Sequence, residues 1–219
     1  MTASNTFGGP VTVNAGTLSV ASDANLGAIP AAVEPGRIVL DGGALRPTSS
    51  FTLDPHRGLA LGPPTGSGAG VFHVGDGITL TYRGIIADNG GTGGLTKIGF
   101  GALALSGANS YTGPTMIRNG TITLDFSHSN SPAANIISSS SALLLGGANA
   151  GLGDTSYAEL VMNVSGTHAN GQAFHGTVID IGPARIQAGG AAEMALGALS
   201  HVPGGVVNIV RPSALGGTG

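Results

Sequence analysis

The hydrophobic pattern of this chain consists of short stretches in which apolar and polar residues alternate, a spacing typical of β-strands that bury one face. Val11 alternates with Val13, and Leu18 alternates with Val20 beyond a polar turn. Nearly every gap between such stretches contains Gly, Asn, Asp or Pro, the residues that favour tight turns. We predict short strands over residues 11–13, 18–20, 37–40, 59–61, 71–74, 78–82, 95–98, 102–105, 143–145, 159–164, 177–181, 184–187 and 206–210.

One unit of this pattern occurs twice. Residues 5–20 align without gaps on residues 109–124, with Asn, Gly, Pro and Thr at matching positions and apolar residues exchanged for apolar residues. Each copy reads as a short strand, a sharp turn and another short strand, which is the path of a chain around one corner of a solenoid. At roughly 20 to 25 residues per coil, the chain would form nine or ten coils and a rod about 45 Å long.

The predicted fold is therefore all-β, a right-handed parallel β-helix, and we expect the chain to be a segment of a longer one. Alternation alone also fits a β-sandwich or a β-barrel. The recurrence of one unit favours the β-helix, and so does the size of the apolar side chains, because small aliphatic residues suit a narrow interior built in stacked layers.

Composition narrows the choice further. The chain has 40 Gly among 219 residues, which disfavours long helices. Its hydrophobic content of 41% is too high for a disordered chain, whereas aromatic residues make up only 4%. This composition predicts a core built from Ala, Val, Leu and Ile.

Charge and processing signals exclude several classes of protein. The net charge is −3, and the eight basic residues are scattered without a basic stripe, so we expect no nucleic-acid partner. The chain contains no Cys, and no apolar run is long enough for a transmembrane helix. The N-terminus lacks the features of a signal peptide and the C-terminus lacks a terminating element, so we expect both ends to continue in a longer protein.

The segment from Gly93 to Gly113, which continues as a repeat to Leu124, resembles the autotransporter passenger-associated β-strand repeat. Residues 5–20 resemble the second half of that repeat, and residues 172–180 and 196–208 resemble segments that lie between such repeats. The resemblance implies a right-handed β-helix that is exported through the outer membrane and acts as an adhesin, a spacer or a scaffold. We expect one domain over residues 1–219, with repeats at about 5–20 and 93–124.

Carboxylates are the residues most open to a catalytic interpretation, because some parallel β-helices cleave polysaccharides. Asp54 and Asp76 are about one coil apart and could stack beside Arg57 or Arg83. Asp154 and Asp180 form a second pair of this kind. The acidic residues are spread evenly along the chain, which favours turn and surface positions for both pairs.

The remaining polar candidates also favour structural interpretations. The loop from Asp88 to Gly94 lacks the spacing of a calcium or phosphate site and is expected to be a turn. Ser106 and the tract Ser138 to Ser141 lie in no nucleophile motif, and the tract is expected to form a corner or an excursion. The six histidines have no metal-binding spacing and are expected in loops: His56, His73, His128, His168, His175 and His201. Tyr82, Tyr111 and Phe126 are too far apart to form a sugar-stacking platform and are expected to cap or fill the core.

We therefore expect no catalytic, cofactor-binding or metal-binding residues, and a structural stalk, scaffold or adhesin segment at the bacterial cell surface rather than an enzyme. Two alternatives remain: a β-helix that binds or cleaves carbohydrate, and a subunit that self-associates end to end into filaments. The expected partners are neighbouring coils of the same longer chain, with surface glycans or proteins as further candidates, and no membrane insertion by this segment.

Overall fold

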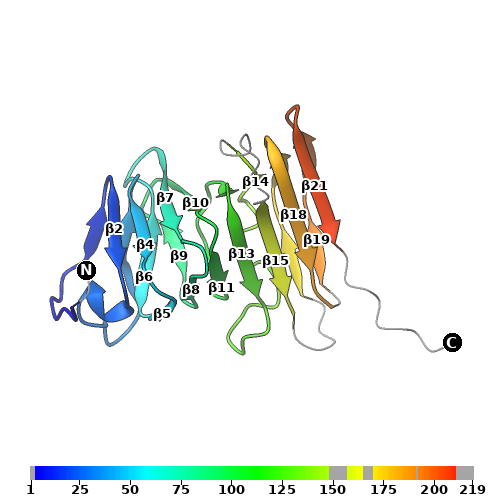
Figure 1. The fold of residues 1–219 in the computed structure, drawn as a ribbon. Helices are drawn as coiled ribbons and strands as arrows, with labels where there is room; N and C mark the ends of the chain where they lie inside the picture. Colours follow the sequence, from blue (N-terminus) through cyan, green and yellow to red (C-terminus); the bar gives the residue numbers. More distant parts are fainter. Residues whose placement is uncertain (1–2, 148–156, 165–169, 191, 211–219) are drawn as a thin grey trace.

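The computed structural model describes residues 3–147, 157–164, 170–190 and 192–210, and in this part of the chain the strands form stacked parallel sheets (Figure 1). The first sheet contains β1 (Val11–Val13), β3 (Glu34–Leu40), β6 (Arg57–Leu61) and β9 (Ile86–Asp88). The second contains β2 (Thr17–Val20), β4 (Ala44–Pro47), β7 (Ser67–His73), β10 (Thr92–Ile98), β12 (Thr115–Ile117), β14 (Leu143–Leu145), β17 (Gly176–Ile179) and β20 (Ala198–His201). The third contains β5 (Phe51–Leu53), β8 (Thr79–Tyr82), β11 (Ala102–Leu105), β13 (Gly120–Asp125), β15 (Ala158–Asn163), β18 (Gly182–Ala188) and β21 (Gly205–Val210).

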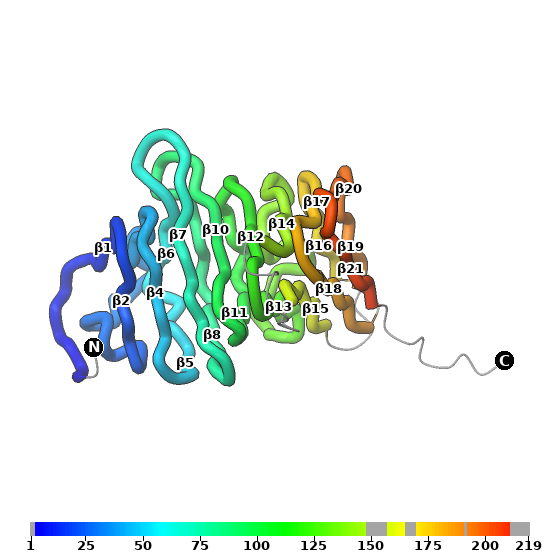
Figure 2. Tube along the Cα trace, turned by 45° about the horizontal axis from the view of Figure 1, so that its top comes forward, coloured from blue at the N-terminus to red at the C-terminus, as the bar shows by residue number. Residues whose placement is uncertain are grey.

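The chain visits these sheets in a fixed order, and from β3 to β11 each circuit adds one strand to each of the three sheets (Figure 2). Strands β3, β4 and β5 form one such circuit, and β6, β7 and β8 form the next. After β9 the first sheet ends, and a small sheet of β16 (Gly171–Ala173) and β19 (Glu193–Ala195) appears near the other end of the molecule. All strand pairs in the described residues are parallel, which confirms the solenoid and is incompatible with a sandwich of antiparallel sheets.

The size of the coils differs from the prediction. The solenoid has about seven turns instead of nine or ten. The chain advances by 19 residues from Leu105 to its partner Leu124, but by 38 from Leu124 to its partner Met162, because excursions leave the coil at some corners. At the usual spacing of strands, the stack is roughly 34 Å long rather than about 45 Å.

The core is a set of columns in which like residues stack from turn to turn. In the third sheet, successive register partners form the column Leu80, Leu103, Ile122, Leu160 and Ile186. All five side chains are buried, and they belong to one continuous apolar cluster along the solenoid. Tyr82, Tyr111 and Phe126 are also buried, which confirms their predicted place in the core.

The strands predicted from alternation are present with shifts of a few residues at their ends. Strands β12 and β13 correspond to the two strands of the repeat copy at residues 109–124, and six further strands were not predicted: β4, β5, β9, β16, β19 and β20. Most of these are very short, and β4 ends at Pro47, a residue that normally argues against a strand in the middle of a sheet. The described residues contain only one helical segment, the 3₁₀ turn η1 (Asp23–Leu26), and no helix with the length and apolar character needed to span a bilayer.

A comparison of two glycines distinguishes the need for a positive φ angle from the need for space between adjacent turns. Gly77 and Gly120 have similar positive φ angles of 67° and 64°. A Cβ on Gly77 would meet open space, whereas a Cβ on Gly120 would lie 2.5 Å from the carbonyl oxygens of Gly99 and Gly101 on the preceding turn. Close stacking of turns therefore requires glycine at position 120.

We predict that Gly77→Ala lowers the free energy of unfolding by about 1 kcal/mol, the cost of a left-handed alanine. Gly120→Ala should cost at least about 2 kcal/mol more, because the turns must also separate locally. Urea unfolding of both variants, followed by far-UV circular dichroism, measures the difference. Equal losses for the two variants would contradict the close contact at Gly120.

Candidate functional site

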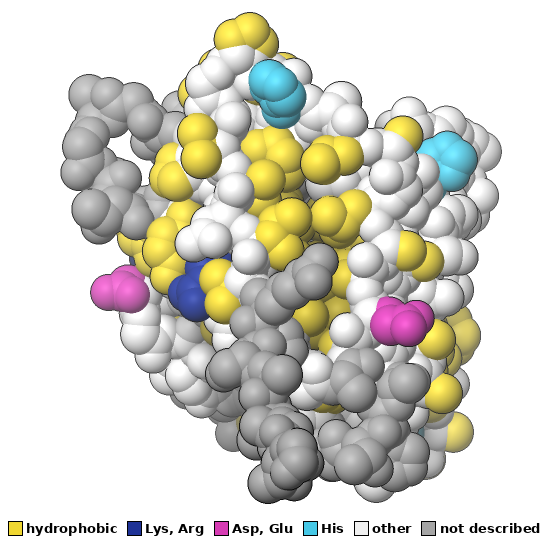
Figure 3. Space-filling view, turned by 90° about the vertical axis from the view of Figure 1, so that its right-hand side faces the viewer, with side chains coloured by type: hydrophobic (Ala, Val, Ile, Leu, Met, Phe, Trp, Pro, Cys, Tyr) yellow, Lys and Arg dark blue, Asp and Glu magenta, His cyan; other side chains and the backbone are white. Residues whose placement is uncertain are grey.

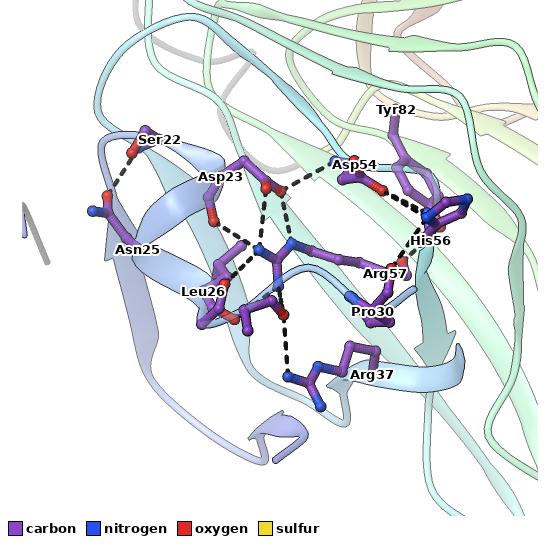
Figure 4. Close-up of polar contacts among 12 residues, drawn as sticks. Ser22, Asp23, Asn25, Leu26, Pro30, Arg37, Asp54, His56, Arg57 and Tyr82 are labelled. Carbon is purple, nitrogen blue, oxygen red and sulfur yellow. Dashed lines mark hydrogen bonds and ion pairs between the residues drawn. The ribbon is translucent and has the colours of Figure 1, made fainter. Parts of the chain in front are cut away.

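The most extensive polar cluster lies near the N-terminal end of the solenoid and is centred on the guanidinium group of Arg57 (Figure 4). Arg57 is completely buried at the start of β6. Its Nε donates to Asp23 Oδ1 at 2.8 Å, and Nη2 donates to Asp23 Oδ2 at 3.1 Å. The remaining donors reach the carbonyl oxygens of Leu26, Gly27 and Ala28. Arg57 therefore binds the whole of the η1 segment to the second complete turn.

The residues around Arg57 close the cluster instead of opening it to a ligand. Tyr82 donates its hydroxyl to the carbonyl oxygen of Arg57 at 2.8 Å. The backbone N–H of Asp54 donates to Asp23 Oδ1, and the neighbouring Arg37 shares the carbonyl oxygen of Ala28 with Arg57. Because every nitrogen of the Arg57 guanidinium has a protein partner, the cluster acts as a brace for a corner of the fold.

Lys97 is a further buried cation besides Arg37 and Arg57, and its position is less expected. It stands in an inner column of the second sheet, where its register partners are Phe72 and Ile117. The side chain is fully buried, and Nζ donates to the carbonyl oxygens of Ile98 at 3.1 Å, Gly99 at 2.6 Å and Asn119 at 3.3 Å. Burial lowers the pKa of Lys97 to about 7, from an ordinary value of 10.5.

Asn109, which belongs to the repeat, links its own turn to the turns on either side. Its side-chain oxygen accepts from the N–H of Ile86 at 2.8 Å, and its side-chain nitrogen donates to the carbonyl oxygen of Ile136 at 2.8 Å. Nearby, the Tyr111 hydroxyl contacts Thr115 Oγ1 at 2.6 Å, and Thr115 Oγ1 contacts Ser141 Oγ at 2.9 Å. The two Asn109 bonds satisfy backbone groups at corners, where no strand ladder can do so, whereas the Tyr111, Thr115 and Ser141 bonds satisfy buried hydroxyl groups.

The structure does not bring Asp54 and Asp76 together. Leu53 is in register with Tyr82, so Asp54 follows the end of β5 and Asp76 precedes the start of β8, at opposite ends of neighbouring strands. Asp76 is exposed, and Asp54 caps the N–H of His56 at 2.9 Å. Arg57 pairs with Asp23, a residue that the sequence did not single out. Asp154 lies outside the described residues, and Asp180 accepts from the N–H of Ile181.

The other sequence candidates also occupy turns and corners. Asp88 closes its glycine-rich loop by accepting from the N–H groups of Gly93 and Thr112, which agrees with the predicted turn. Within the Ser138 to Ser141 tract, Ser138 and Ser140 bond to each other, whereas Ser141 is buried in the network with Thr115. His168 lies outside the described residues, and the described residues hold no group of three or more potential metal ligands.

Comparison with known proteins extends the resemblance seen in the sequence. The family model of the passenger-associated-transport-repeat matches residues 1–20 and 95–124. A curated relative, the Adhesin BmaC autotransporter of Brucella suis biovar 1 (strain 1330), is 41% identical over 118 residues, which cover 52% of this chain and 3% of that protein. The chain thus spans a small fraction of the length of the curated relative it matches. No solved structure gives a significant match. These findings confirm the resemblance to autotransporter passenger repeats.

The lowered pKa of Lys97 predicts a pH-dependent stability. Between pH 7 and pH 9 the unfolded chain keeps Lys97 protonated, whereas the folded chain increasingly holds it neutral, so the unfolded state binds more protons. The free energy of unfolding should therefore rise with pH, by at most about 1.4 kcal/mol per pH unit. Above this window, burial of Tyr82 and Tyr111 raises the pKa of both phenols and opposes the trend.

Urea titrations at several pH values between 7 and 9 measure this slope. The variant Lys97→Met keeps a long apolar side chain in the column but removes the titrating group, so its slope should be lower than that of the original chain. If the free energy of unfolding rose equally with pH in both proteins, the pKa of Lys97 would not be lowered and the prediction would be wrong.

Proposed function

We propose that residues 1–219 form a single β-solenoid segment of a larger autotransporter-type surface protein, and that the segment acts as a structural stalk or adhesin module without catalysis of its own. The observation that carries this proposal is the unbroken inner column from Leu80 to Ile186, which runs through successive turns of the stack. Such a stack resists bending and can hold other domains away from a surface.

The repeats support a place at the outside of the bacterial cell. The matched family is described as a passenger-associated-transport repeat, and the curated relative is named an adhesin autotransporter. The absence of Cys suits export as an unfolded chain, because no disulfide can form before translocation. Folding outside the membrane would then proceed turn by turn, since each turn contacts mainly its neighbours.

Among the described residues, several carboxylates are engaged in structural bonds at separate places in the fold. Asp23 binds Arg57, Asp88 closes a loop, and Asp54 caps a turn. Most glycoside hydrolases use two carboxylates that face one substrate. The pairs that could have served this purpose are separated or lie partly outside the described residues, which favours the stalk over the enzyme.

Apolar side chains exposed on the last described turn support the proposal that a neighbouring coil of the same longer chain packs there. Leu199 and Ile209 continue inner columns, yet they are 55% and 53% exposed because no described strand stacks over them. Figure 3 shows hydrophobic side chains gathered across this end of the molecule. We expect a further coil of the same longer protein to cover this end, and a second copy of the chain to do so when no such coil is present.

The proposed function predicts that the chain is exported and folds at the cell surface. The chain is fused behind an export signal and in front of an outer-membrane translocation barrel, with an N-terminal nanobody as a reporter. Intact cells should bind the antigen and yield a protease-resistant core of the solenoid. The matched control carries Ile122→Asp, which places a charge in the core and should export a protease-sensitive segment. Equal protease sensitivity of both segments would contradict the stalk.

A second measurement addresses catalysis. The purified chain is incubated with neutral and acidic polysaccharides, and new reducing ends are counted for the original chain and for a double variant with Asp54→Ala and Asp76→Ala. We expect no turnover by either protein. Turnover that the double variant loses would favour the enzyme.

A further inference from the structure

A small hollow lies on the outer flank of the third sheet, across the starts of β13 and β15. It has a volume of about 140 Å³ and is open to solvent on one side. Five residues line it, and we call it the flank hollow: Phe100, Gly120, Thr121, Tyr157 and Glu159. It is separate from the Arg57 cluster and from the apolar end of the stack, and of its five residues only Gly120 has a structural role described above.

Two aromatic side chains border the flank hollow from different turns. Phe100 lies in the corner before β11, Tyr157 lies directly before β15, and they are 48% and 38% exposed. The register of Ala102 with Thr121 and of Thr121 with Glu159 places the two aromatic residues two turns apart, at about 10 Å along the stack. Gly120 lies between them and has no side chain, so the space between the rings stays open.

The polar side of the flank hollow is held in place by a network of side chains. Thr121 Oγ1 donates to Glu159 Oε2 at 2.9 Å, and Arg185 Nη1 lies 3.3 Å from Glu159 Oε1. Arg185 also donates to Gln187 at 2.8 Å, and its guanidinium carbon lies 6.0 Å from the centre of the Tyr157 ring. The network fixes the carboxylate of Glu159 at the hollow, where further lone pairs of its oxygens remain available.

Charge decides which ligand fits this arrangement. Arg185 neutralises Glu159, so the hollow offers little net attraction to either an anion or a cation. What remains is an amphipathic site with aromatic surfaces on its borders and a fixed hydrogen-bond acceptor beside them. A pyranose ring has the matching chemistry, because its C–H faces are apolar and its rim carries hydroxyl donors.

We propose that the flank hollow binds one pyranose unit of a neutral glycan. The sugar lies between the rings of Phe100 and Tyr157 and packs one C–H face against each of them, and its hydroxyl groups donate to the carboxylate of Glu159. Binding requires no cleavage and leaves the solenoid unchanged. The inference therefore goes beyond the stalk, because it assigns a ligand to the flank of the rod.

Saturation-transfer NMR with cellohexaose, maltohexaose and chitohexaose tests the proposal on the purified chain. At least one of these neutral hexasaccharides should receive saturation from the protein. Tyr157→Ala and Phe100→Ala should each weaken the affinity for that hexasaccharide about tenfold, because each removes one stacking surface. Tyr157→Phe, which keeps the ring, should bind within about threefold of the original chain.

The matched control is Ile29→Ala, which trims another exposed apolar side chain outside the flank hollow and should leave the affinity unchanged. Absence of transfer to all three hexasaccharides would overturn the proposal. So would transfer that survives in both alanine variants. Preferential binding of choline or of hexagalacturonate would show instead that the hollow selects an ion, and this result also contradicts the proposal.

Discussion

The fold depends on one constraint: the inner face of each turn is buried only by the turns stacked on either side of it. A single turn has no interior of its own, so its apolar residues must coincide in register with those of its neighbours. The column of Leu80, Leu103, Ile122, Leu160 and Ile186 satisfies this condition, and Ile209 shows what happens at the end of the stack, where the same position becomes exposed. Small aliphatic side chains and close backbone contact at residues such as Gly120 follow from the same constraint.

The buried polar side chains form hydrogen bonds with backbone groups at the corners of the coil, where the strand ladders offer no partners. Strand ladders pair the backbone groups along the flat sides of the coil, but at each corner the chain leaves the ladder with unpaired carbonyl and N–H groups. Arg57, Lys97 and Asn109 supply partners for these groups, and each of them links different turns or segments. Their burial therefore reflects the architecture of the corners.

Much of the fold could be predicted from the sequence, because alternation and turn residues record the local structure of each strand. The repeat of residues 5–20 at 109–124 revealed how the strands connect. The number of turns could not be predicted, since the excursion between Leu124 and Met162 leaves no regular period in the sequence. Lys97 could not be recognised as a core residue either, because its depth depends on partners in adjacent turns. The flank hollow combines Phe100 with Tyr157, which are far apart in sequence and meet only through the register.

The central claim is thus the register in which strands pair on adjacent turns. Disulfide cross-linking tests this register most directly, because the natural chain contains no Cys. Thr123 and Val161 are partners on adjacent turns, whereas Ala104 lies one turn further from Val161. A chain with Thr123→Cys and Val161→Cys should form an intramolecular disulfide readily under mild oxidation, since neighbouring strands place Cα atoms within disulfide range. A chain with Ala104→Cys and Val161→Cys should remain reduced. Efficient cross-linking of the second pair, or failure of the first, would contradict the stacked register.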